Sequence, residues 1–234
     1  MTLAIMQPYI FPYIGYFQLM NAADEFVIYD NIEFTKKGWI NRNRILANGK
    51  ADYITLPLKK DSDYLHINQR YLADIWIDNR KKMMNSIIEW YKKSPYFQFA
   101  FPIIEEAVLF EESNLFKFIY HSLCLIKEYL NIETTLLVSS AIAIDHELKA
   151  QEKVIEICKA RNAGRYINPI GGLELYDREV FQKQHIDLNF LKTSEVVYTQ
   201  FNHEFVPFLS IIDVIMFNSK EKIKEFLNFS YSLI

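Results

Sequence analysis

Residues 6–19 of this chain read MQPYIFPYIGYFQL, and they follow a short apolar run at the N-terminus. Pro8 and Pro12 argue against a core strand, because each proline removes a backbone hydrogen-bond donor. The many aromatic and aliphatic side chains argue equally against a solvated linker. We therefore predict a rigid, partly buried loop at the end of a strand. In open α/β sheets ligands bind outside the carboxyl ends of the strands, so this loop is the first candidate site.

The residues on either side of the loop predict a βαβ unit. Residues 2–6 (TLAIM) have the composition of a buried strand of a parallel sheet. A helix is expected to begin near Gly15, because apolar residues recur there at helical spacing. A second apolar run, 26–29 (FVIY), ends at Asp30. This order indicates an α/β, Rossmann-like fold with a mainly parallel sheet and flanking helices.

Residues 39–58 predict a β-hairpin inserted into this fold. Two strand-like segments flank the pair Asn48-Gly49. Both central residues of a type I′ turn need a positive φ, and Asn-Gly is the pair that most strongly favours it.

The first strand of the hairpin carries two arginines, Arg42 and Arg44. Alternation places both of them on one face. It places Trp39, Asn41 and Asn43 on the other face. Two guanidinium groups are therefore expected to point the same way.

The hairpin region is also strongly basic. Residues 36–60 hold seven lysines and arginines and one acid, Asp52, in a chain whose net charge is −3. One interpretation is a solvated hairpin face. The other is an anion-binding clamp made by Lys37, Arg42 and Arg44, because arginine offers phosphate a bidentate fork and lysine offers it a point charge.

The middle of the chain is predicted to be helical. Residues 77–131 repeat the helical period and are interpreted as an insertion within a single domain, 1–234. A strand is expected at 134–138, and Ser139-Ser140 follow it. That position presents polar groups to a ligand in an α/β sheet.

Another strand is predicted at 166–168, and a glycine-rich turn, 169–172 (PIGG), follows it. Such a turn before a helix can hold a phosphate, which would involve Asn168, Gly171 and Gly172. A purely structural turn is the simpler interpretation, because the three-glycine fingerprint of dinucleotide sites is missing. The residues after Ser219 are expected to form a terminal amphipathic helix.

Composition excludes several classes of protein. Half of the 234 residues are apolar, which predicts a packed globular core. The net charge of −3 argues against a nucleic-acid binder. No apolar run is long enough for a membrane span, and no signal peptide is recognisable, so a cytoplasmic location is expected. The histidines show no paired spacing, so no metal is predicted. Cys124 and Cys158 are expected to be core residues.

These motifs together resemble the WbqC-like protein family. The family pattern contains MQPYxFPYIGYFQL, DxFVIYD, KxGWINRNRIL, a Ser-Ser pair, YINPxGGxxLY and FVPxLSIIDxxM. The matching segments here are 6–19, 24–30, 36–46, 139–140, 166–176 and 205–216. The resemblance implies a bacterial, cytoplasmic protein of O-antigen, lipopolysaccharide or other surface-polysaccharide biosynthesis. It also implies the proposed family activity, transfer of glycine to an amino sugar.

A more distant similarity is to adenylyl-transferring α/β enzymes with an HxGH signature after the first strand. This chain has Tyr13-Ile14-Gly15-Tyr16 in that place. Gly15 would allow a nucleotide to approach the backbone. Both histidines are replaced by tyrosine, so either the basic hairpin substitutes for them or adenylation is lost.

Two functions are therefore expected as alternatives. The first is a transferase that joins an acyl or glycyl group to the amine of a nucleotide-linked amino sugar, with ATP or another activated acyl donor. The second is a non-catalytic module that binds a nucleotide or nucleotide sugar. The oligomeric state is left open.

The candidate site is expected at the carboxyl end of the first strand, facing Asp30, the arginine pair, the two serines and the glycine-rich turn. Asp30 or His203 would take the amine proton. The substrate- or nucleotide-binding candidates are Gln7, Pro8, Tyr9, Tyr13, Gly15, Tyr16, Lys37, Trp39, Asn41, Arg42, Arg44, Ser139, Ser140, Asn168, Gly171 and Gly172.

Overall fold

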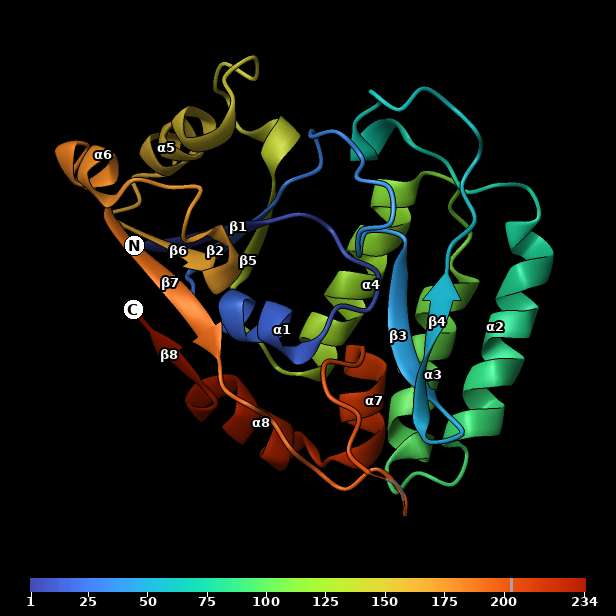
Figure 1. Ribbon diagram of the computed structural model, residues 1–234. Coiled ribbons are helices and arrows are strands. Elements are labelled where there is room, and N and C mark those ends of the chain that lie inside the picture. Colours follow the sequence, from blue (N-terminus) through green and yellow to red (C-terminus); the bar gives the residue numbers. More distant parts are fainter. Residues whose placement is uncertain (203) are drawn as a thin grey trace.

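The structure is a computed structural model that describes residues 1–202 and 204–234 (Figure 1). The strands are β1 Thr2–Met6, β2 Glu25–Ile28, β3 Arg42–Ala47, β4 Lys50–Thr55, β5 Thr135–Val138, β6 Arg165–Pro169, β7 Asp187–Thr193 and β8 Tyr231–Leu233. The α-helices are α1 Ile14–Asn21, α2 Trp76–Tyr91, α3 Phe97–Leu109, α4 Leu115–Tyr129, α5 Ala150–Ala160, α6 Arg178–Lys183, α7 Ile211–Phe217 and α8 Lys220–Phe229. Short 3-10 helices cover Ile67–Gln69, Ser139–Ala141 and Ile170–Gly172.

The main sheet has the strand order β5-β2-β1-β6-β7-β8. β1 pairs in parallel with both β2 and β6, and β5 and β7 extend the parallel pairing on either side. The chain moves outward from β1 to β2 and later to β5, and it then crosses β1 to form β6. This reversal is a topological switch point, where open α/β sheets bind ligands. The predicted Rossmann-like, mainly parallel α/β fold is confirmed.

Helices cover both faces of the sheet, with α5 and α6 on one side and α1 and α8 on the other (Figure 1). Leu3 and Ile5 are packed in the cluster that contains α5 and α6, whereas Ala4 is packed in the larger cluster that contains α1 and α8. Because β1 is buried on both faces, its sequence is a continuous apolar run without alternation.

The hairpin β3–β4 lies outside the main sheet (Figure 1), and β3 contacts α7 and, through Leu46 and Tyr91, the end of α2. Its turn residues Asn48 and Gly49 have φ values of 50° and 74°, so the predicted positive-φ turn is confirmed. Ile45 of β3 and Ile104 of α3 belong to the same buried cluster as the large face of the sheet. The helical segment therefore shares its core with the sheet.

The C-terminus adds an element that the sequence did not predict. α8 ends at Phe229, and β8 then pairs antiparallel with the end of β7. Three residues are too few to show an alternating pattern. This pairing depends on α8, which brings the C-terminus to the edge of the sheet.

Among residues 1–202 and 204–234, no helix combines the length and apolar character needed to cross a lipid bilayer.

Candidate functional site

Asp30 lies at the carboxyl end of β2, beside the residues that follow β5. Its side chain is almost fully buried, with 1% of its surface exposed. Oδ1 accepts a hydrogen bond from the Ser140 backbone N–H at 2.9 Å, and Oδ2 accepts one from Ser140 Oγ at 2.7 Å. The parallel pairing of β2 with β5 explains this contact, because it places both strand ends at the same edge of the sheet.

A third donor comes from a segment that sequence reasoning did not connect with the site. Asn68 Nδ2 donates to Asp30 Oδ2 at 2.7 Å, and the Asn68 backbone N–H donates to the Asp30 carbonyl oxygen at 3.1 Å. A buried carboxylate is stable only when donors surround it. Asp30 therefore holds together the end of β2, the end of β5 and the turn at Asn68.

A buried lysine on α5 lies at the same edge and was also missed. Lys153 is 4% exposed, and its Nζ donates to the carbonyl oxygen of His146 at 3.1 Å. The ammonium also lies 5.3 Å from the ring centroid of Tyr29, the residue before Asp30. Burial lowers the pKa of Lys153, and the negative charge of Asp30 opposes this change. The site therefore contains a cation and an anion that influence each other.

Two buried polar atoms near this pair have no hydrogen-bond partner among the residues that the structure describes. They are Asn31 Oδ1 and Ser139 Oγ. The other end of the Asn31 amide, Nδ2, lies 2.9 Å from His146 Nδ1. Buried polar atoms without a partner are uncommon in folded proteins and mark a place where a ligand or water can bind.

On the other side of the switch point, β6 contributes Asn168. Its Oδ1 accepts a hydrogen bond from the Tyr166 hydroxyl at 2.9 Å. A Cβ atom on Gly172 would lie 1.9 Å from Asn168 Nδ2, whereas a Cβ atom on Gly171 would meet nothing within 4 Å. Gly172 is therefore needed for the position of the Asn168 side chain.

We expect Gly172→Ala to lower the free energy of unfolding by about 1–3 kcal/mol, because the new methyl group must displace the Asn168 amide. Gly171→Ala is the matched control in the same turn, and its change should stay within about 0.5 kcal/mol. Urea denaturation measures both variants. Equal effects of the two substitutions would contradict this role of Gly172.

The loop at residues 7–13 is held in place mainly by other parts of the protein. Asn43 Nδ2 donates to the carbonyl oxygens of Ile10 and Phe11, and Ser210 Oγ donates to the Phe11 carbonyl. Pro8 is buried, whereas Gln7 and Tyr9 are partly exposed. Of this loop, Gln7 directly follows β1 and so lies at the switch point.

The backbone at Gly15 lies close to two side chains of the protein itself. A Cβ atom there would lie 2.3 Å from Tyr13 Cε2 and 2.5 Å from Thr193 Oγ1. Tyr16 is 2% exposed, and its hydroxyl donates to the carbonyl oxygen of Gln7 at 3.1 Å. These side chains pack the start of α1 against the end of β7 and against the loop.

The two hairpin arginines share one face, as alternation predicted, but Trp39 lies on that face as well. The Arg44 guanidinium lies 5.5 Å from the Trp39 ring, and Trp39 stacks on Tyr53. The prediction for Trp39 was wrong because β3 begins only at Arg42, so alternation does not extend back to residue 39. Asn43 does face the core, with 4% of its surface exposed.

The arginines are bound to backbone carbonyl groups. Arg42 donates to the carbonyl oxygens of Gly38 and Lys37, and Arg44 Nη2 donates to that of Phe208 at 3.2 Å. Asn41 Nδ2 donates to the Leu56 carbonyl oxygen. None of these contacts reaches Asp30.

His203, the second candidate for the proton acceptor, lies outside the described residues. Among the residues that are described, no group of three or more His, Cys, Asp and Glu side chains could hold a metal ion.

The fold and this edge define a Rossmann-like α/β protein with a buried Lys153 and Asp30, and an exposed Ser140, at the carboxyl edge of its parallel sheet. The chain belongs to the WbqC-like protein family, whose model matches residues 7–225. It is similar to a Mycobacterium tuberculosis protein whose name is "Uncharacterized protein Rv1507c", with 28% identity over 233 residues that cover 97% of each chain. No solved structure matches the chain.

Proposed function

We propose that the protein is a transferase of surface-polysaccharide biosynthesis, which moves an acyl group, such as glycyl, onto the amine of a nucleotide-linked amino sugar. Membership of the WbqC-like family supports the choice of this pathway, which the resemblance to that family implies. The observation that carries the chemistry is the buried Lys153 ammonium at the same sheet edge as the Asp30–Ser140 pair. The switch point beside β1 is where such a fold binds its ligand.

The proposed reaction needs a stabilised oxyanion and an acceptor for one proton. The sugar amine attacks the carbonyl carbon of the activated acyl group, which forms the N–C bond and places negative charge on the carbonyl oxygen. The Lys153 ammonium stabilises that charge. The bond between the acyl carbon and its leaving group then breaks, and the leaving group departs with the electron pair.

The amine proton has a short route within the site. Ser140 Oγ, which lies 2.7 Å from Asp30 Oδ2, accepts the amine proton and passes its own proton to the carboxylate. ATP, or another activated acyl donor, supplies the activation, because a free carboxylate is a poor electrophile.

One observation favours the alternative, a binding module without turnover. Both carboxylate oxygens of Asp30 already accept hydrogen bonds, and its surface is 1% exposed. Such a carboxylate fixes the shape of a site without reacting. Nucleotide-sugar binding would then be the whole function.

The deciding experiment combines the purified protein with ATP, glycine and UDP-linked amino sugars, and it follows pyrophosphate release and the mass of the sugar. We expect product whose mass increases by one glycyl group. Ser140→Ala should slow its formation about 10²-fold, because the proton route is lost. Ser86→Ala, at a partly exposed position of α2 outside both the sheet edge and the groove, is the control. Saturable nucleotide-sugar binding with no product from any activated donor would support the binding module instead.

A further inference from the structure

A groove with a volume of about 650 Å³ lies between the loop after β2, the hairpin and the segment that follows β4. Its size is within the range of small-molecule sites, which is about 300–1,000 Å³. Its charged lining consists of two acids, Asp61 and Asp63, and six basic residues. The basic residues are Lys36, Lys37, Arg42, Lys59, Lys60 and Arg70. The groove is thus strongly positive in a chain of net charge −3.

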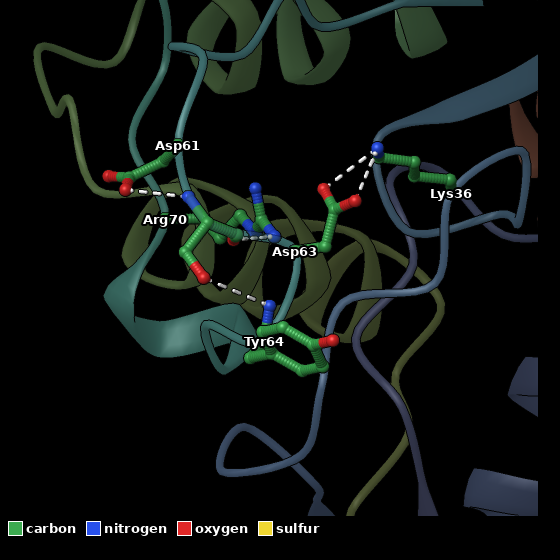
Figure 2. A network of polar contacts seen from close by, with 6 residues as sticks. Lys36, Asp61, Asp63, Tyr64 and Arg70 are labelled. Atoms are coloured by element: carbon green, nitrogen blue, oxygen red, sulfur yellow. Dashed lines mark hydrogen bonds and ion pairs between the residues drawn. The ribbon is translucent and has the colours of Figure 1, made fainter.

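Two of these cations have carboxylate partners. Lys36 Nζ lies 2.7 Å from Asp63 Oδ1, as Figure 2 shows, and Lys59 Nζ lies 2.9 Å from Asp74 Oδ1. The hydrogen bond from Lys36 holds the pKa of Asp63 below its usual range, and the charges of Lys36 and Arg70 act in the same direction. The other four cations form no ion pair among residues 1–202 and 204–234. They are Lys37, Arg42, Lys60 and Arg70.

Arg70 distinguishes this groove from a solvated basic surface. Its side chain is 5% exposed, and its guanidinium lies 4.8 Å from the Phe34 ring centroid. Nη2 donates to the Ser62 carbonyl oxygen at 2.7 Å (Figure 2), while Nε has no partner among the described residues. A buried guanidinium without a carboxylate is costly. An anion in the groove would offset that cost.

Two backbone segments that line the groove also run to the sheet edge near Asp30. Asn68 donates to the Asp30 carboxylate at 2.7 Å, and Arg70 follows two residues later in the same segment. On the other side, the loop that leaves Asp30 supplies Phe34 and Lys37 to the groove. A ligand group bound in the groove would therefore lie beside the segments that hold Asp30 in place.

We propose that this groove binds the diphosphate group of a nucleotide-linked substrate, an inference that rests on the proposed function for the identity of that substrate. The diphosphate of a nucleotide-linked sugar is esterified at both ends and carries about two negative charges near neutral pH, and the four cations without carboxylate partners complement them. Arg42 and Arg70 provide the guanidinium N–H groups that do not donate to backbone carbonyl groups, and Lys37 and Lys60 provide point charges. Arg44 lies outside the groove lining and is not part of this site.

The test is direct binding of inorganic pyrophosphate and of UDP, measured by titration calorimetry without any acyl donor. We expect saturable binding of both, and Lys37→Gln/Lys60→Gln should weaken it at least tenfold. The control is Lys81→Gln/Lys82→Gln, which removes the same charge from exposed positions of α2 outside the groove. Arg70→Lys keeps the charge but removes the planar guanidinium group, so it should weaken UDP binding. The melting temperature of this variant is measured as well, to compare its stability with that of the wild-type protein.

Each result decides between the proposals. Equal weakening by the two double variants, or no binding of either ligand by the wild-type protein, would overturn the diphosphate site. Binding of pyrophosphate without UDP would replace the nucleotide with a free phosphate ligand. Diphosphate binding without acyl transfer would leave this site intact and refute only the transferase.

Discussion

Asp213→Ala should lower the free energy of unfolding by about 3 kcal/mol or more, the largest stability effect that we expect in this protein. Asp213 is completely buried in the first turn of α7. Its oxygens accept three hydrogen bonds, from the Tyr91 hydroxyl at 2.8 Å, the Tyr198 hydroxyl at 2.6 Å and Gln200 Nε2 at 2.6 Å. Alanine would leave these donors unsatisfied, at about 1–3 kcal/mol for each buried group.

The effect is large because Asp213 joins segments that are far apart in the chain. Tyr91 ends α2, and its hydroxyl also accepts a hydrogen bond from the Leu46 backbone N–H of β3. Gln200 both donates to and accepts from the backbone of Val206. Loss of the carboxylate therefore loosens the contact of α7 with the hairpin and with the segment around residue 200.

Chemical denaturation followed by circular dichroism measures this effect. Asp213→Asn is the informative companion, because its amide oxygen still accepts hydrogen bonds, and it should lose less stability than Asp213→Ala. Asp187→Ala is a surface control, since Asp187 is exposed and its ion pair with Arg165 is exposed as well. A loss for Asp213→Ala no greater than that of the control would contradict the structural role of the network.

Lys153→Met should reduce acyl transfer by about 10²–10³-fold, which is the usual cost of losing a donor to a developing oxyanion. The same change should leave the free energy of unfolding unchanged or raise it. Methionine keeps the packing against Tyr29. It also removes a charge that is buried away from water in the folded protein, which is costly. A residue with only a structural role would not lose activity while the protein keeps its stability.

The pH profile gives an independent measurement of Lys153. Burial lowers the pKa of its ammonium below the usual value of 10.5. If the protonated form stabilises the oxyanion, the rate falls as the pH rises through this lowered pKa, and Lys153→Met removes that fall. Lys159→Met, on the exposed side of α5, is the control and should keep both the rate and the profile. A fully active Lys153→Met would disprove the proposed role.

Several parts of the site could be predicted because they depend on local signals. The apolar runs at β1 and β2 identified a parallel sheet, and each strand end marked the residues that follow it. Asp30 and Ser140 were both expected at the same edge, and the structure places them in direct contact. Their meeting follows from strand order, which short apolar strands and a βαβ unit constrain.

Other parts could not be predicted because they depend on contacts between distant residues. Asn68 lies in a segment without a clear pattern, yet it donates to Asp30. Lys153 lies next to the apolar face of α5, where periodicity shows which side faces the core but not which neighbour it meets. The basic cluster was visible in the sequence, but Arg70, which gives the groove its buried cation, lies outside that cluster.

The sequence by itself determined the parallel strands, the hairpin turn at Asn48-Gly49 and the family to which the chain belongs. Only the tertiary structure decided the role of residues 6–19, which form the end of β1, the loop after it and most of α1. The Phe11 carbonyl oxygen accepts hydrogen bonds from Asn43 and Ser210. The side chains of Tyr13 and Thr193 occupy the space beside Gly15. The physical reason is that a local pattern specifies which residues become buried, whereas the partners that bury them come from distant segments of the folded chain.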